Sequence, residues 1–157
     1  MEREEAFEKL KNWCAYQERS QFDVRKKLLS LKISSSDIDS IIVDLIEENF
    51  LNEERFAMAF VGGKFRIKHW GKQKIKMELR KHQVSEYCIN KALASLSNDH
   101  YEAEAAKLIQ KKLDISKHTD RRKLYYSIMN YMLSKGYETN LVSKQLNQLL
   151  EIQTDES

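Results

Sequence analysis

The chain of 157 residues contains no proline and only four glycines. β-Sandwiches and barrels need many tight turns, for which glycine and proline supply the backbone angles, so their scarcity argues against both folds. Lysine, leucine and glutamate are the commonest residues instead, and with isoleucine, glutamine and alanine they give a composition that favours helices. We therefore predict an all-α protein.

Cysteine is scarce as well. Cys14 and Cys88 are too far apart for a disulfide framework and neither lies in a CxxC pair, so we predict that both pack as small apolar side chains. No stretch approaches 18 apolar residues, and the first ten residues lack the apolar core of a signal peptide. These absences predict a soluble cytosolic protein that makes no membrane contact.

Motifs of catalysis are also missing. The histidines lack HExxH spacing, and no GxSxG sequence or phosphate-binding loop occurs. Glu53 and Glu54 are interpreted as the first turn of a helix rather than as an acid/base pair. Cysteine and histidine show no metal-ligand spacing. We therefore expect no enzyme, no metal and no cofactor. The four histidines are His69, His82, His100 and His118.

An apolar pattern occurs three times, at offsets of 51 and 53 residues, with the same internal spacings of 4, 5, 5, 4 and 3. A period of roughly 50 residues indicates a tandem array of supersecondary units. Units of this size are near the lower limit for an independent core, so neighbours should support one another. The three sets are Val24, Leu28, Ile33, Ile38, Ile42 and Leu45; Ile75, Leu79, Val84, Ile89, Leu93 and Leu96; and Ile128, Met132, Tyr137, Val142, Leu146 and Leu149.

Each unit is predicted to contain one long and two short helices, with the short helices joined by a turn of three to five residues. The predicted fold is all-α: three tandem three-helix (helix-turn-helix-like) repeats, at 1–49, 50–98 and 99–157, in an elongated, curved array. Gly62-Gly63 is expected to end or kink the helix that begins near Asn52. The third helices carry few bases, which disfavours sequence-specific reading of DNA.

Charge is unevenly placed along the chain. Residues 37–54 hold seven acids and no base, whereas residues 64–81 hold eight bases and one acid. We interpret residues 64–81 as a docking surface for an anionic partner; a solvated helix face is the alternative. Weaker basic spots recur in the other units, the third at Arg121, Arg122 and Lys123. The candidate binding residues are Arg25, Lys26, Lys64, Arg66, Lys68, Trp70, Lys72, Lys74, Lys76, Arg80 and Lys81.

The basic segment contains a regular stripe of bases and one tryptophan. Lys72, Lys76 and Arg80 repeat every four residues and are expected on one helix face, opposite the face of Ile75 and Leu79. Trp70 stands among the bases, where it could anchor a partner or belong to the core.

Four segments resemble signatures of the RecX regulatory proteins: ERSQFDVRKKL (18–28), NFLNEERFAMAFV (49–61), GKQKIKMELRKHQVSEYCINKAL (71–93) and KGYETNLVSKQL (135–146). The F-L-x-x-x-R-F-A part is the most specific. The chain departs from the family where glycine is favoured, with Lys32, Asn49 and Gln83 at those places. The signature residues matched are Ser20, Leu28, Leu51, Arg55, Phe56, Ile75 and Leu79.

The resemblance implies a role. RecX-like proteins modulate the RecA recombinase, usually as inhibitors: they lie in the groove of the RecA–DNA filament and oppose its extension, ATP hydrolysis and strand exchange. We expect a monomer whose partner is RecA or its filament, with weak contact to single- or double-stranded DNA. Direct nucleic-acid binding through residues 64–81 is the alternative function. Whether RecA is inhibited or stimulated is left open by the sequence.

Overall fold

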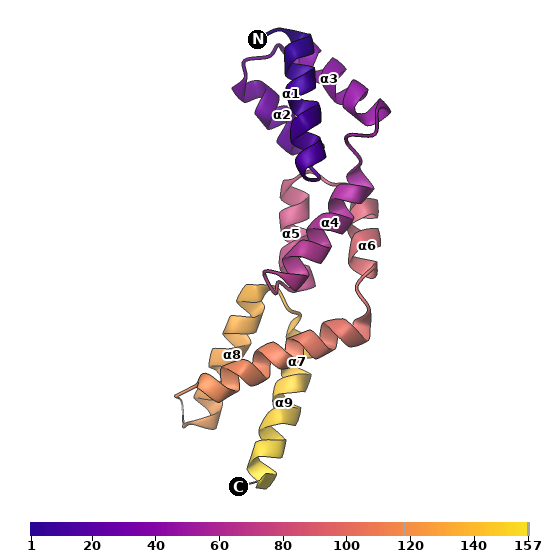
Figure 1. Ribbon diagram of the computed structural model, residues 1–157. Helices are drawn as coiled ribbons and strands as arrows, with labels where there is room; N and C mark the ends of the chain where they lie inside the picture. Colours follow the sequence, from indigo (N-terminus) through magenta and orange to yellow (C-terminus); the bar gives the residue numbers. More distant parts are fainter. Residues whose placement is uncertain (118, 157) are drawn as a thin grey trace. The chain divides into compact units, whose positions relative to one another are not determined.

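The computed structural model describes residues 1–117 and 119–156, so His118 lies outside the described residues (Figure 1). Every regular element in this part of the chain is an α-helix, and the all-α helical repeat prediction is confirmed. The helices are α1 (Arg3–Tyr16), α2 (Gln21–Ser30), α3 (Ser35–Glu47), α4 (Glu53–Arg66), α5 (Lys72–Lys81), α6 (Glu86–Ala94), α7 (Asn98–Ile115), α8 (Arg121–Lys135) and α9 (Thr139–Glu156).

The threefold apolar pattern is a pattern of buried side chains. Fifteen of its eighteen members are buried, and Leu93, Leu96 and Leu149 are half-buried. Apolar residues at this spacing place one stripe of each helix against its neighbours, and burial of that area is the main force that holds such short helices together. The repeat seen in the sequence is therefore a repeat of the core.

The turn inside each repeat has the same backbone. Lys32, Gln83 and Gly136, which occupy equivalent positions, have φ of 61°, 59° and 98°. In each turn this residue donates its N–H to the carbonyl three residues earlier, at 3.0 Å. The next residue donates to the carbonyl five residues earlier, at 3.1–3.2 Å. This is the Schellman motif, which uses a left-handed residue to satisfy the last carbonyls of a helix. The turn keeps its shape where glycine is absent.

The chain groups into two compact units. Unit 1 contains residues 1–61 and 78–93, and unit 2 contains residues 62–77 and those from 94 onwards. The division passes through α4 and α5 and does not coincide with the predicted boundaries at 49 and 98, which stay a prediction. Helix α4 continues through Gly62-Gly63 to Arg66, so the helix end predicted there is wrong.

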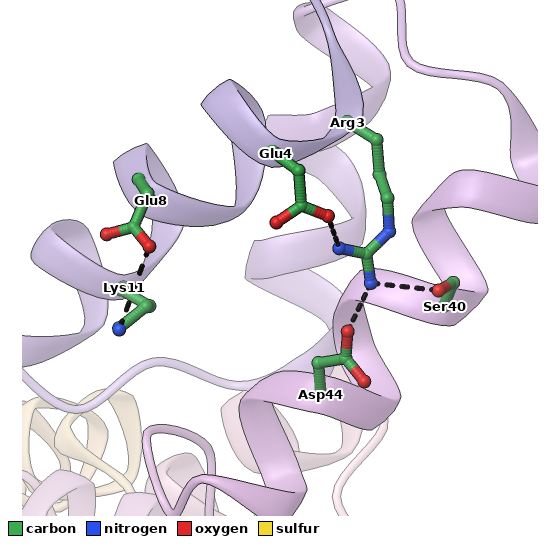
Figure 2. A network of polar contacts seen from close by, with 6 residues as sticks. All are labelled: Arg3, Glu4, Glu8, Lys11, Ser40 and Asp44. Atoms are coloured by element: carbon green, nitrogen blue, oxygen red, sulfur yellow. Dashed lines mark hydrogen bonds and ion pairs between the residues drawn. The ribbon is translucent and has the colours of Figure 1, made fainter.

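Within unit 1, α1, α2 and α3 pack around one core. Ala6, Leu10, Val24, Leu28 and Leu45 are completely buried in its core. A polar network joins the start of α1 to α3, as Figure 2 shows: the Arg3 guanidinium contacts Glu4 and Asp44 and donates to Ser40 Oγ at 2.9 Å. These contacts fix the first turn of α1 against the middle of α3.

Unit 2 contains a close contact between backbones. The Gly71 N–H donates to the Lys135 carbonyl at 2.7 Å, and the Gln73 N–H donates to the Gly136 carbonyl at 2.9 Å. The first amides of α5 thus meet the last carbonyls of α8, so each satisfies groups that a helix end leaves without a partner. A Cβ on Gly71 would lie 2.5 Å from the backbone of Gly136 and Tyr137, so only glycine fits.

Unit 1 has an equivalent joint made by side chains. Ser20 and His82 stand 51 and 53 residues before Gly71 and Lys135. Ser20 caps α2 by accepting from the Asp23 N–H, and its Oγ lies 3.2 Å from His82 Nδ1. The rings of Phe22, Phe56 and Phe60 surround the imidazole, with centroids at 5.3–6.2 Å. The same joint therefore occurs twice, once with side chains and once with backbone.

Candidate partner-binding surface

The loop between α4 and α5 carries an indole that two ammonium groups contact. Lys64 Nζ lies 4.9 Å and Lys74 Nζ 4.5 Å from the centroid of the Trp70 ring. The backbone N–H of Trp70 donates to the Lys64 carbonyl at 3.1 Å, which folds the loop back onto the end of α4. We call Lys64, Trp70 and Lys74 the Trp70 cluster. Cation–π attraction holds both ammonium groups beside the half-buried ring, so Trp70 is neither free nor a core residue.

A second cation in this unit is fixed by a buried tyrosine. Lys72 Nζ lies 4.6 Å from the centre of the Tyr101 ring, and the Lys72 N–H donates to Tyr101 Oη at 2.9 Å. Tyr101 in turn donates its hydroxyl proton to the Glu138 carboxylate at 2.9 Å. Burial first, and then the charge of Glu138, raise the pKa of Tyr101. The phenol therefore stays protonated and keeps donating at physiological pH.

The start of α5 is further surrounded by positive charge. Lys135 Nζ donates to the Lys68 carbonyl at 3.0 Å, which brings a base of α8 to the loop before α5. Arg66 and Lys68 are exposed, and the Arg66 guanidinium lies close to Gly62. Unit 2 thus gathers predicted binding residues from the end of α4, the loop and the start of α5.

Two other predicted binding residues form ion pairs with acidic side chains of unit 1. Arg80 makes a two-pronged contact with Glu86, at 2.7 and 3.3 Å, and this hydrogen bonding raises the pKa of Arg80. Lys81 Nζ lies 3.0 Å from Glu78. These exposed pairs contribute little to stability, but they reduce the charge offered to a partner.

The basic spot on α2 is smaller than the sequence indicated. Arg25 lies 3.0 Å from Asp39 of α3, which partly neutralises it. Lys26 is exposed beside a shallow cleft lined by Trp13 and Arg19.

The stripe of Lys72, Lys76 and Arg80 does not lie opposite the buried face of α5. At 100° per residue these bases are centred about 80° from Ile75 and Leu79. Lys72 and Lys76 are accordingly half-buried, whereas Arg80 is exposed. The expected opposite placement is wrong, and the stripe borders the core.

Sequence reasoning missed a second indole–cation pair. In unit 1 the Arg19 guanidinium lies 4.0 Å from the Trp13 ring centroid, and Arg19 Nε donates to the Trp13 carbonyl at 3.2 Å. An offset of 51 residues carries Trp13 to Lys64 and Arg19 to Trp70. The same two positions therefore hold an indole and a cation in opposite order. The constant offset was the signal that could have revealed this.

The matched signature residues serve the fold of the chain itself. Leu28, Leu51, Phe56, Ile75 and Leu79 are buried, and Ser20 caps α2. Arg55 is exposed enough to bind a partner, yet its guanidinium is used within unit 1. It donates to Glu18 Oε1 at 2.8 Å and to both the side-chain and backbone oxygens of Asn49 at 2.9 Å.

Within residues 1–117 and 119–156, His, Cys, Asp and Glu side chains do not gather in threes that could hold a metal ion. In the same part of the chain, every helix falls short of the length and apolar content that crossing a membrane requires.

The sequence of this chain is similar to curated proteins over most of its length. Residues 52–93 match the family model described as RecX, second three-helix domain. Regulatory protein RecX of Clostridium beijerinckii is 28% identical over 140 residues, which cover 88% of this chain and 65% of that protein. The Clostridium perfringens protein of the same name is 31% identical over 122 residues, covering 76% and 57%. The chain thus spans less than two thirds of the length of either relative.

Solved structures share the fold. The crystal structure of RecX from Lactobacillus salivarius superimposes with a TM-score of 0.83 at 23% identity, covering 94% of this chain and 96% of that one. A second crystal structure, of regulatory protein RecX, gives a TM-score of 0.81 at 19% identity, with 90% and 70% covered.

Proposed function

Since this chain belongs to the RecX family, we propose that it binds the RecA recombinase filament and inhibits its ATP hydrolysis, its extension and strand exchange. It acts as a regulator and not as an enzyme, and it works in the cytoplasm beside its partner. The basic faces of the repeats dock in the groove of the filament.

The observation that supports this proposal is the Trp70 cluster. Two ammonium groups held by one ring lose less side-chain entropy when they pair with carboxylates or phosphates than free lysines would. The exposed Arg66 and Lys68 and the nearby Lys135 extend the positive surface. Several weak contacts along one polymer add through effective concentration, which suits an array of repeats.

The proposal is tested by following RecA ATP turnover on single-stranded DNA as the chain is added. The parent chain should suppress turnover. The variant Lys64→Glu/Lys74→Glu should need roughly tenfold more protein for the same suppression, which corresponds to about 1.4 kcal/mol of binding. Lys9→Glu/Lys144→Glu is the matched control, because it reverses two exposed lysines far from this cluster in sequence.

Turnover that the parent chain leaves unchanged at stoichiometric amounts would overturn the proposal. If both double variants suppress turnover equally, the chain still binds RecA, but the Trp70 cluster takes no part in the binding. Circular dichroism should show the same helix content in all three proteins.

A second candidate function is direct binding of single-stranded nucleic acid. One observation favours it: α8 begins with Arg121 and Arg122, and Tyr126, 54% exposed, lines a groove of about 510 Å³ with them. An exposed ring beside arginines can stack on a base. Titration of a labelled oligonucleotide at several salt concentrations tests it, since each phosphate contact should contribute about −0.7 to the logarithmic salt slope. Binding only in the presence of RecA would remove this candidate.

A further inference from the structure

The first and last repeats carry opposite charge on exposed surfaces. Residues 1–11 and 34–51, which include most of α1 and all of α3, hold nine Asp and Glu against three Lys and Arg. Residues 107–123, which include the second half of α7 and the start of α8, hold seven Lys and Arg against two Asp. Neither surface includes the Trp70 cluster.

The basic surface encloses an apolar groove. A groove of about 370 Å³ lies along α7 and α8, and Leu108, Ile115 and Tyr131 line it together with Lys107, Lys111 and Lys112. Glu104 also lines the groove and lies 3.3 Å from Lys107, so three lysines there face one acid. A neighbouring hollow of about 240 Å³ shares Ile115 and Tyr131. Ile115 is 63% exposed. The groove therefore offers an apolar floor with lysines around it.

The acidic surface offers a matching helix face. Ile38, Ile41, Ile42 and Leu45 of α3 are buried, whereas Val43 and Ile46 are 50% and 43% exposed. Asp39 and Glu47 lie on the same side as Val43 and Ile46, because the four fall within roughly 100° around the helix axis.

Internal ion pairs lie beside this face without covering it. Arg25 contacts Asp39 at 3.0 Å as an exposed pair. The network of Figure 2 holds Ser40 and Asp44 toward α1. Val43, Ile46 and Glu47 remain exposed.

We propose that α3 of one copy docks in the α7–α8 groove of a second copy. Val43 and Ile46 would cover the apolar floor, and the acids beside them would meet the lysines of the rim, as in other helix-in-groove contacts. Nucleic acid fits less well, because a phosphate backbone has no apolar group for Ile115 and Leu108. The face of Tyr131 is also taken by Lys112, whose Nζ lies 4.1 Å from the ring centroid.

The contact joins two different surfaces, so it is heterologous and leaves one of each surface available for a further copy. One helix in one groove buries less than the roughly 1,200–2,000 Å² of a standard interface. Association is therefore weak, and dilute protein is monomeric. It strengthens at low salt, because its charges are exposed. The contact needs neither RecA nor DNA.

Sedimentation velocity of the full chain, without RecA or DNA, tests the contact. The mean mass should rise with concentration at low salt and fall back when salt is added. Lys107→Glu/Lys111→Glu makes the groove acidic, and Asp39→Lys/Glu47→Lys makes the helix face basic. Each variant alone should stay monomeric, because its two surfaces then carry the same sign. A mixture of the two should associate, because opposite signs meet again.

Circular dichroism and thermal melting of both variants should match the parent, so that a loss of association cannot be a loss of fold. A parent chain that remains monomeric at every concentration overturns the proposal. So does a mixture that fails to associate when the parent does. A monomeric parent that binds a labelled oligonucleotide, with binding lost in Lys107→Glu/Lys111→Glu, would assign the groove to nucleic acid and also overturn it.

Discussion

Arg55 shows how a signature residue can serve structure. Its guanidinium donates to Glu18 and to two oxygens of Asn49, whose φ of 65° is left-handed. Asparagine tolerates that conformation better than most residues, but it still costs energy relative to glycine. Arg55 compensates by holding the Asn49 carbonyl at the turn between α3 and α4. The planar fork of arginine suits three acceptors at once, and lysine cannot reproduce it.

Replacing Arg55 should therefore destabilise unit 1. We expect Arg55→Lys and Arg55→Ala to lower the free energy of unfolding by about 1–2 kcal/mol each, because both remove the guanidinium that serves Glu18 and Asn49 together, while one oxygen of Glu18 is already buried without a partner. Urea denaturation measures the change. Arg66→Ala, which removes an exposed arginine of the same helix, is the control and should alter stability by less than about 0.5 kcal/mol.

The buried thiol of Cys14 should make both alkylation and stability depend on pH. Burial raises the pKa of Cys14 from 9.0 to about 11. Because the thiolate is the reactive form, alkylation of the folded chain at neutral pH should be slow and should accelerate as pH rises toward 11. A raised pKa also means that the folded chain holds its proton longer, so the free energy of unfolding should fall between pH 9 and 11. Mass spectrometry after timed alkylation measures the first effect. Cys14→Ala should reduce the second without abolishing it, because burial also raises the pKa of Cys88 and Tyr101.

At the scale of helices and turns, the threefold Schellman motif is the main result. Its hydrogen bonds are the same in all three repeats, although only the third has glycine at the left-handed position. Backbone geometry is thus set by the packing of the helices on either side, and the residue at the turn adapts to it. Lys32 and Gln83 carry a local strain that the core supports.

Glycine at those turns should relieve the strain. We expect Lys32→Gly and Gln83→Gly each to raise the free energy of unfolding by about 0.5–1 kcal/mol, the left-handed strain being partly offset by the greater freedom of glycine in the unfolded chain. Gly136→Ala is the opposite test and should destabilise, because its Cβ would also lie 2.4 Å from Lys74 Cβ. Thermal unfolding of the three variants gives the signs; a loss of stability in both glycine variants would contradict the strain argument.

Much of the helical architecture could be predicted from side-chain periodicity. The apolar pattern marked the buried residues, and the offset of about 50 marked the repeats. The pattern could not mark the pairing of charged side chains, which depends on how neighbouring helices pack. Arg80 pairs with Glu86 and Arg25 pairs with Asp39, and the positions of the charges in the sequence do not reveal these pairs. The contact of Gly71 with the end of α8 uses backbone atoms, which leave no pattern of side chains.

At the scale of the molecule, the two equivalent joints differ in how closely their helices meet. The Ser20–His82 joint has side chains between its helices and adjoins a cavity of about 180 Å³. The Gly71–Lys135 joint brings backbone against backbone. Side chains can rotate to new contacts, whereas backbone hydrogen bonds fixed by a close approach cannot. Unit 2 should thus tolerate less change at its joint than unit 1.

Gly71→Ala should show this intolerance. Its Cβ would overlap backbone atoms, and we expect a loss of about 1–3 kcal/mol together with faster amide exchange at the start of α5 and the end of α8. Gly63→Ala is the matched control: its Cβ would meet nothing within 4 Å, so helix propensity alone should raise stability by about 0.5–1 kcal/mol. Ser20→Ala, at the equivalent place in unit 1, should cost about 1–2 kcal/mol, because it removes both the cap of α2 and the contact with His82 but introduces no overlap.

The opposite order of indole and cation at positions 13/19 and 64/70 has a consequence for anyone who would build on this scaffold. In the first two repeats neither position has a chemical identity of its own, and the two residues complement each other in either order. The third repeat has Lys117 and Lys123 at these places, without an indole. A designer who copies the first or the second repeat must therefore choose the two residues together, whereas a copy of the third does without the pair.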